Sequence, residues 1–290
     1  MPEHFGIDVS HHNGKIDWKK VKESGKTFAL MKCQYESKSH RKDETFEYNY
    51  AESGKQGIKR GVYIYIGKES AKDPYNDAKC LLQNLNSRKL EMGIWLDLED
   101  DALKSQNFEF IRSIAKIYAK IFTEAGYFVG IYCNHNWYKH YISKELKDNF
   151  KFWIARYPKN DYGIYNSGSE LRPTASCAAI WQYSSKGKVN GINGNVDLNV
   201  WFRNLDAKAE KKEKIKNPYR LTKTFMRSGY IGESAKWLQF ELNRHGADLK
   251  IDGIFGQKTK EALMLYQKRN KLKVDGIFGA ETKESLWNNI

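Results

Sequence analysis

The sequence predicts an α/β protein made of a closed eight-stranded barrel followed by a small all-α domain. Three observations predict it. Eight short apolar segments recur over about the first 200 residues, and amphipathic segments lie between several of them. Little helical pattern separates the last three segments, so we expect the ring to be irregular there. A charged stretch then leads into an internal repeat.

The eight segments are rich in β-branched and aromatic residues and are apolar on both faces, as in a buried, mainly parallel sheet. We expect strands at Phe5–Val9, Thr27–Cys33, Arg60–Ile66, Gly93–Leu98, Tyr127–Cys133, Phe152–Arg156, Ala178–Tyr183 and Val196–Val200. The clearest helix is Phe108–Ala125, whose apolar side chains recur at three- and four-residue spacing.

The chain divides into a barrel over residues 1–207, a charged linker over 208–224 and a tail domain over 225–290. The tail repeats itself, because Lys250–Gly256 returns 23 residues later as Lys273–Gly279. In each copy Asp-Gly predicts a tight turn, Phe a core plug and the following residues a helix. With an earlier helix at Ser234–Leu242, this predicts three helices around two turns.

Composition excludes several classes of protein. The chain has 290 residues, 40% hydrophobic residues, and 49 Lys and Arg against 35 Asp and Glu, a net charge of +14. It has no run of about 18 apolar residues for a membrane span, no recognition motif for nucleic acid, and no signal-peptide pattern at its start. We therefore expect synthesis in a cytoplasm without the usual export signal.

The cysteines and histidines predict neither a metal centre nor a disulfide. Cys33, Cys80, Cys133 and Cys177 are 44 to 53 residues apart, and no HxxH or HExxH spacing accompanies the adjacent pair His11 and His12. Phosphate-binding glycine loops and the GxSxG elbow are also absent from the sequence. We expect no cofactor.

The strongest chemical signal is the pair Asp97 and Glu99 in Gly-Ile-Trp-Leu-Asp-Leu-Glu-Asp. Side chains two residues apart on a strand share a face, and the carboxyl ends of barrel strands carry the active site. Clustered carboxylates raise one another's pKa, which suits the acid needed to cleave a glycosidic bond. The competing interpretation is an acidic turn in which Asp100 or Asp101 caps a helix.

Two further acids occupy equivalent places, Asp8 on the first strand and Asp197 on the last. Closure of the barrel would bring these strands together and both acids into one bowl. Polar and aromatic side chains near the strand ends favour a carbohydrate cleft, since sugar rings stack on aromatic rings. They are Tyr63, Tyr65, Tyr132, Trp153, Gln182 and Tyr183.

The order and spacing of these motifs over about residues 4–203 resemble the glycoside hydrolase family 25 muramidases. The motifs are Phe-Gly-Ile-Asp8-Val-Ser, Gly-Val-Tyr63-Ile-Tyr65, Trp-Leu-Asp97-Leu-Glu99, Ile-Tyr132-Cys-Asn, Trp181-Gln182-Tyr183 and Val-Asp197-Leu-Asn. One departure is Ile64, where that family often has His. The tail resembles the peptidoglycan-binding type 1 domain through its two Asp-Gly-x-Phe-Gly-x-x-Thr units. The combination resembles phage endolysins and autolysins of Gram-positive bacteria.

The resemblance implies an irregular (β/α)5(β)3 barrel that hydrolyses the β-1,4 bond between N-acetylmuramic acid and N-acetylglucosamine. Glu99 would be the general acid, Asp97 would orient the substrate's N-acetyl group as an internal nucleophile, and Asp8 and Asp197 would complete the acidic bowl. Direct attack by water remains the alternative mechanism. The separation of the two carboxyl groups would distinguish the two routes.

The implied partner is bacterial cell-wall peptidoglycan, reached after release from the host cell in which the chain is made. The positive charge suits anionic wall polymers, with a merely solvated surface as the alternative. Three other functions stay open. They are a wall-binding protein with an inactive barrel, a chitinase-like hydrolase, and a zinc amidase or peptidase, for which the sequence offers no ligand set.

Overall fold

The computed structural model describes residues 3–36, 39–174, 176–202, 217–245, 247 and 249–288. The chain forms two compact units, Met1–Ala209 and Glu210–Ile290. The expected linker over 208–216 lies outside the described residues. Residues 217–224 were also assigned to the linker from the sequence. In the structure they belong to the second unit and bond to its helix at residues 233–244. The Asn217 amide donates to the Trp237 carbonyl, and the Thr222 backbone amide donates to Ser234 Oγ.

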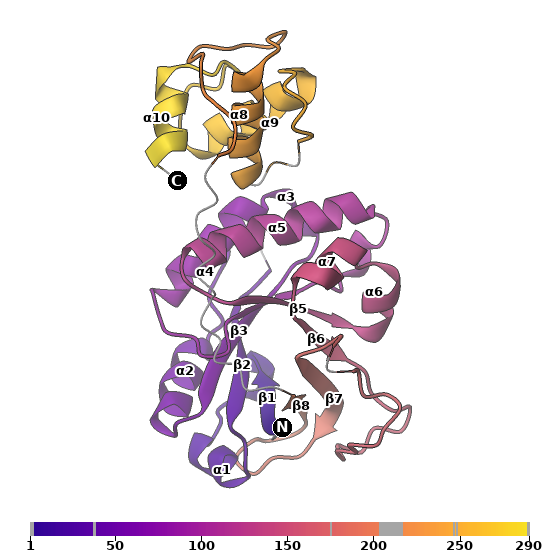
Figure 1. The fold of residues 1–290 in the computed structure, drawn as a ribbon. Helices are drawn as coiled ribbons and strands as arrows, with labels where there is room; N and C mark the ends of the chain where they lie inside the picture. Colours follow the sequence, from indigo (N-terminus) through magenta and orange to yellow (C-terminus); the bar gives the residue numbers. More distant parts are fainter. Residues whose placement is uncertain are drawn as a thin grey trace. The chain divides into compact units, whose positions relative to one another are not determined.

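The first unit is a closed barrel with the strand order β1 to β8 (Figure 1). All eight predicted strands are confirmed, with ends that differ by at most four residues. They are β1 His4–Val9, β2 Phe28–Gln34, β3 Lys59–Tyr65, β4 Ile94–Asp97, β5 Val129–Asn134, β6 Phe152–Ala155, β7 Ile180–Gly187 and β8 Val196–Trp201.

Helices cover the barrel from β1 to β6. They are α1 Trp18–Glu23, α2 Phe46–Lys55, α3 Lys68–Lys72, α4 Pro74–Leu85, α5 Phe108–Glu124, α6 His135–His140 and α7 Lys144–Asn149, with short 3-10 turns at His11–Asn13 and Asp101–Leu103. Asn107 caps α5 by accepting from the Phe110 amide at 2.8 Å.

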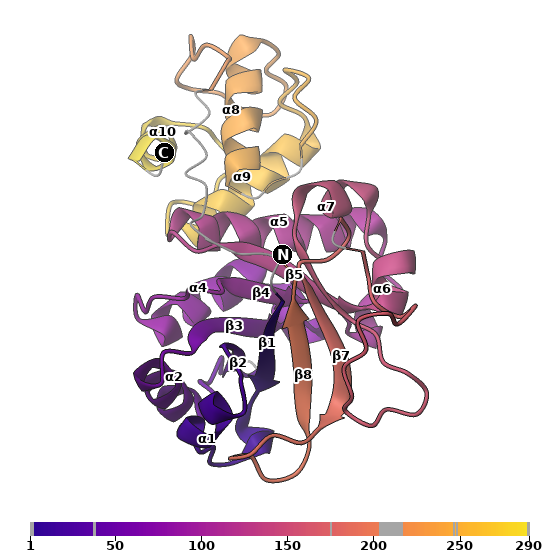
Figure 2. The same cartoon turned by 60° about the horizontal axis from the view of Figure 1, so that its bottom comes forward.

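The barrel is irregular where the sequence predicts it. β1 to β7 pair in parallel, whereas β8 pairs antiparallel with both β7 and β1. Among the described residues no helix separates β6, β7 and β8. Figure 2 shows β1, β8 and β7 side by side with no helix in front of them. The antiparallel closure turns the start of β8 toward the carboxyl end of β1.

Aromatic side chains fill the barrel interior below the strand ends. Trp95, Trp153 and Trp201 are almost fully buried there and pack with Phe28 and Tyr132. Gly130 faces Trp95 so closely that an added Cβ would lie 2.3 Å from the indole ring. This tight packing makes the interior a solid floor rather than a pore.

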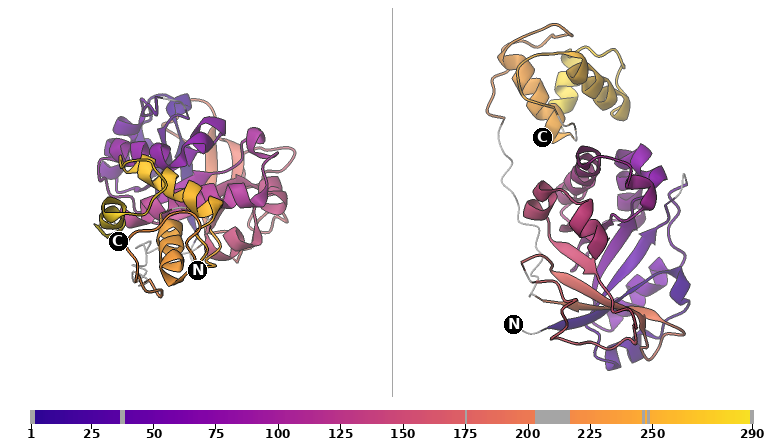
Figure 3. Two further views of the ribbon diagram at one scale, coloured as in Figure 1. Left: turned by 90° about the horizontal axis from the view of Figure 1, so that it is seen from above. Right: turned by 90° about the vertical axis from the view of Figure 1, so that its right-hand side faces the viewer.

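In its described residues the second unit has three helices, α8 Glu233–Arg244, α9 Gln257–Arg269 and α10 Ala280–Asn288 (Figure 3). Its core includes Phe255 and Phe278, the two predicted plugs, both fully buried. Gly253 and Gly276 have positive φ values of 79° and 67°, which explains the glycine in each turn.

A glutamine side chain holds each repeated turn through the same set of hydrogen bonds. Gln239 Nε2 donates to Asp252 Oδ1 at 2.8 Å and to the Ile254 carbonyl at 3.0 Å, while its Oε1 accepts from the Gly253 amide at 2.9 Å. Gln267 makes the equivalent bonds in the second turn. The repeat therefore includes a buried glutamine that the sequence match alone does not reveal.

We predict that Gln267→Ala lowers the stability of the second unit by about 2 kcal/mol, because buried backbone groups of the second turn lose their partners. Hydrogen exchange of peptides from residues 250–288 in the full chain measures this loss. Gln257→Ala is the control, since Gln257 is exposed and its amide bonds the Glu261 side chain. Equal hydrogen-exchange protection in both variants would contradict the stabilising role of the Gln267 hydrogen bonds.

Candidate active site

Two of the four predicted acids meet where the barrel closes. Asp8 near the end of β1 is paired in register with Asp197 on β8. Asp8 is only 7% exposed, and its Oδ2 accepts from Gln182 Nε2 at 2.8 Å and from Asn199 Nδ2 at 2.7 Å. Antiparallel pairing of the first and last strands therefore creates this carboxylate pair.

Burial is the main reason that the pKa values of both acids are raised. Burial is the main cause for Asp8, and the negative charge of Asp197 adds to it. Burial raises the pKa of Asp197 from 3.8 to about 6, and a hydrogen bond with Asp8 opposes the shift. Both carboxyls therefore hold their protons at a higher pH than an exposed aspartate does.

Asp97 and Glu99 lie at the carboxyl end of β4. Asp97 is 7% exposed, and its buried Oδ1 finds no hydrogen-bond partner among the residues that the structure describes. Glu99 is half-buried, and its Oε2 accepts from the backbone amide and the side-chain Nδ2 of Asn134 at 3.1 and 3.0 Å. Asn134 ends β5, so the neighbouring strand orients this carboxyl.

The pKa values of this second pair are also raised. For Asp97 the cause is burial and then the negative charge of Glu99, while Lys32 opposes the shift and Asp8 adds to it. For Glu99 the cause is burial, and the hydrogen bonds from Asn134 oppose it. Because the charge of Asp8 acts on Asp97 and that of Glu99 acts on Asp197, the four acids lie close enough to influence one another, and we call them the acid group.

Gln182 on β7 connects the acids to two tyrosines. Its amide nitrogen donates to Asp8, and its Oε1 accepts from the hydroxyls of Tyr132, at 3.0 Å, and Tyr157. Three further residues of the site were not predicted, namely Tyr157, Asn134 and Asn199. Asn134 ends β5 and Asn199 lies two residues after Asp197, so strand-end position and alternation were the available signals for these two.

The other predicted cleft residues divide into a floor and a wall. Trp153 is 1% exposed, and its indole donates to Asn199 Oδ1 at 2.8 Å, so it supports the site from below. Tyr132 lies above it, with ring centroids 4.3 Å apart. Tyr63 and Tyr65 remain half-buried at the end of β3, beside the acids.

Tyr183 was predicted to contact substrate, and the structure places it elsewhere. It packs against Tyr165 and Trp181 on the outer side of the barrel, with ring centroids 5.3 and 5.7 Å away. Successive side chains of a strand point to opposite faces, so Gln182 can face the acids only if Tyr183 does not. The prediction for Tyr183 is therefore corrected.

Comparison with known proteins identifies the barrel. The sequence model described as "Glycosyl hydrolases family 25" matches residues 7–192, and that of a "Putative peptidoglycan binding domain" matches residues 231–286. The chain belongs to glycosyl hydrolase family 25. It is thus a glycoside hydrolase, and the resemblance stated from the motifs is confirmed.

Related proteins of this family include enzymes from several bacteria. The autolytic lysozyme of Clostridium acetobutylicum is 28% identical over 267 residues, covering 90% of this chain and 72% of that protein. Lysozyme M1 of Streptomyces globisporus is 27% identical over 206 residues, covering 67% and 66%.

Among solved structures, the lysozyme from Streptomyces coelicolor has a TM-score of 0.54 and 25% identity, covering 71% of this chain and 95% of that one. The autolysin LytC from Streptococcus pneumoniae, solved with a synthetic peptidoglycan ligand, has a TM-score of 0.56 and 25% identity, covering 69% and 47%. The predicted barrel fold is confirmed by these neighbours.

The histidine pair has a structural role in this family 25 chain. His11 Nδ1 pairs with Asp43 Oδ2 at 2.8 Å, and the rings of His11 and His12 are 3.8 Å apart. Within the described ranges, no group of three His, Cys, Asp or Glu residues could hold a metal ion. All four cysteines are free thiols, two of them buried.

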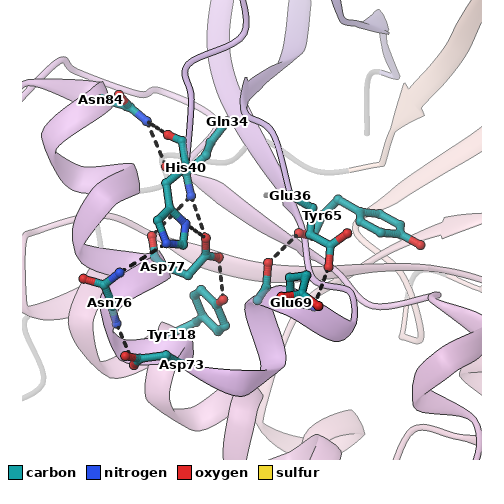
Figure 4. A network of polar contacts seen from close by, with 11 residues as sticks. Gln34, Glu36, His40, Tyr65, Glu69, Asp73, Asn76, Asp77, Asn84 and Tyr118 are labelled. Atoms are coloured by element: carbon teal, nitrogen blue, oxygen red, sulfur yellow. Dashed lines mark hydrogen bonds and ion pairs between the residues drawn. The ribbon is translucent and has the colours of Figure 1, made fainter. Parts of the chain in front are cut away.

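A buried polar network holds the segment after β2 against α4 (Figure 4). Asp77 accepts from His40 Nδ1 at 2.6 Å, from Gln34 Nε2 at 2.8 Å and from the Tyr118 hydroxyl at 2.6 Å. Glu36, in the same segment, accepts from the Glu69 amide at 2.8 Å. This network fixes the chain beside Tyr65, at the edge of the acid group.

We predict that Asp197→Asn makes the barrel more stable at neutral pH. The folded protein keeps the Asp197 proton up to about pH 6, whereas an unfolded Asp loses it near 3.8, so stability falls as pH rises through this window. The variant lacks this loss. Its advantage should therefore grow by about 2 kcal/mol between about pH 4 and about pH 7.

Urea unfolding of the full chain, followed by the near-ultraviolet signal of the buried tryptophans, measures the difference at each pH. The control is Asp148→Asn, which changes an exposed acid whose partner is Lys144 on α7. An advantage of Asp197→Asn that does not depend on pH would contradict the assigned pKa.

Proposed function

We propose that this family 25 enzyme is a muramidase that hydrolyses the β-1,4 bond between N-acetylmuramic acid and N-acetylglucosamine, with Glu99 as the general acid. The observation that carries the proposal is the Glu99 carboxyl itself. It is half-buried, has a raised pKa, and is held by Asn134 beside a second buried acid at the open end of the barrel.

Glu99 suits proton donation to the leaving oxygen. A raised pKa keeps a larger share of this carboxyl protonated near neutral pH, and donation to the glycosidic oxygen requires that proton. Both hydrogen bonds from Asn134 go to the same oxygen, Glu99 Oε2. The other oxygen, Oε1, is therefore the one that can carry the proton toward the substrate.

Asp97 suits a role in positioning the sugar. Its buried Oδ1 has no hydrogen-bond partner in the described part of the chain, and an unsatisfied buried acceptor is unfavourable. The N–H of an N-acetyl group would satisfy it and would aim the acetamido oxygen at the anomeric carbon. We therefore favour the acetamido group as internal nucleophile over direct attack by water.

Asp8 and Asp197 supply negative charge where positive charge develops on the sugar. Above about pH 6, Asp197 carries its negative charge beside Asp8. Gln182 and Asn199 hold Asp8 in place, while Tyr63 and Tyr65 form the wall on the β3 side. This arrangement stabilises an oxocarbenium-like transition state electrostatically.

We predict that Glu99→Gln reduces turnover of peptidoglycan about 10²- to 10⁴-fold while leaving glycan binding largely intact, because the amide keeps the shape and loses the proton. Mass spectrometry of wild-type digests should find N-acetylmuramic acid at the new reducing ends. N-acetylglucosamine at those ends would disprove the muramidase. A barrel that only binds glycan would release no new ends with either protein.

Peptidoglycan is the partner of the second unit, whose sequence matches a peptidoglycan-binding domain. We propose further that the net charge of +14 draws the chain to anionic wall polymers, and that the protein acts on the cell wall after its release from the producing cell. No helix in the described part of the chain has the length and apolar character of a membrane crossing.

We predict that a chain ending at Ala209 keeps cleaving soluble glycan but is retained less on purified walls, since it lacks the second unit. Co-sedimentation with walls at low and high salt measures retention, and release of reducing ends from soluble glycan measures activity. Retention equal to that of the full chain would show that the barrel alone binds the wall.

A further inference from the structure

The segment between β6 and β7 carries two exposed apolar side chains that the active site does not use. Tyr162 and Ile164 are each 76% exposed. They alternate with Asp161, Gly163 and Tyr165, which face the protein. Positions 161–165 therefore alternate between half-buried and exposed residues, with a bend at Gly163.

Asp161 fixes the beginning of this segment. Its Oδ1 accepts from Ser184 Oγ at 2.6 Å and from the Gly163 amide at 3.0 Å, and its Oδ2 accepts from the Ser185 amide at 2.8 Å. Both serines belong to β7. The exposed Tyr162 thus follows a residue that is tied to the barrel.

Gly163 and Tyr165 fix the rest of it. Gly163 has a φ of +71°, and an added Cβ would lie 3.0 Å from Gly187 Cα, so the backbone lies directly on the end of β7. The Tyr165 ring packs against Phe5 with centroids 5.0 Å apart, and its hydroxyl donates to Glu3 at 2.6 Å. The outward side chains are therefore presented on a fixed backbone.

The segment borders the acid group. Tyr157 bonds Gln182, the residue that also holds Asp8. Ser184, which bonds Asp161, is paired with Leu198, the neighbour of Asp197 on β8. Consecutive Cα atoms are about 3.8 Å apart, so the Cα of Tyr162 lies at most about 19 Å from that of Tyr157.

Single exposed apolar residues are common and need no explanation. Here two of them stand two positions apart on a pinned backbone, beginning next to Asp161, whose negative charge acts on Asp197. A rigid aromatic presents a large surface at low entropic cost, which is the property that a binding platform needs.

We propose that Tyr162 and Ile164 form a distal subsite for the N-acetylated glycan strand, in which the tyrosine ring stacks on a sugar and the isoleucine contacts an N-acetyl methyl group. This proposal rests on the proposed function and adds to it a preference for long strands. The subsite contributes only when the strand extends beyond the sugars at the four acids.

The experiment compares kcat/KM of the full chain on peptide-free glycan strands of four sugars and of eight or more. For Tyr162→Ala the ratio of long-strand to short-strand kcat/KM should fall about fivefold, mainly through KM, and Tyr162→Phe should restore it because the ring is kept. Ser167→Ala, an exposed position of the same loop, is the matched control.

A second measurement does not depend on turnover. In the Glu99→Gln background, Tyr162→Ala should weaken calorimetric binding of the long strand about fivefold relative to its parent. An unchanged ratio and unchanged binding, or an equal loss on short and long strands, overturns the subsite. If wild-type protein cleaves no glycan, the muramidase proposal fails and the binding measurement still decides the subsite.

Discussion

The antiparallel pairing of β8 with β1 is the constraint on which the site depends. It places Asp8 opposite Asp197 and lets Gln182 and Asn199 donate to the same Asp8 oxygen. A slip of one residue would turn every side chain of β8 to the other face of the sheet. The register of this one strand pair therefore decides whether the acids meet.

The acid group is unfavourable for folding and useful for chemistry. Burial and mutual repulsion raise the pKa values of its members, and Asp97 Oδ1 has no partner. The aromatic floor below, with Trp95, Trp153 and Trp201 almost fully buried, offsets this cost and keeps the carboxyls in place. A substrate that donates to Asp97 and faces Glu99 completes the hydrogen bonding that the protein alone leaves unfinished.

The family and the barrel could be predicted because their signals are local. Each strand is a short apolar run, and each acid stands at a strand end, so closure of the ring implied the bowl. The predictions that the structure revises depend on which side of a strand a side chain points to, or on which residues a segment contacts. Gln182 and Tyr183 are adjacent and so point in opposite directions, and residues 217–224 have a linker's composition but pack on α8. Tyr157 is in a loop without periodicity, so no pattern marked its bond to Gln182.

By itself the sequence determined the order of strands and helices, the repeated tail and the identity of the carboxyl residues, since these follow from side-chain type and spacing along the chain. Only the tertiary structure decided which oxygen of Asp8 is bonded, how Asn134 orients Glu99, and that residues 161–165 are pinned to β7. The physical reason is that pKa values and hydrogen bonds depend on distances between strands, and these distances exist only once the barrel has closed.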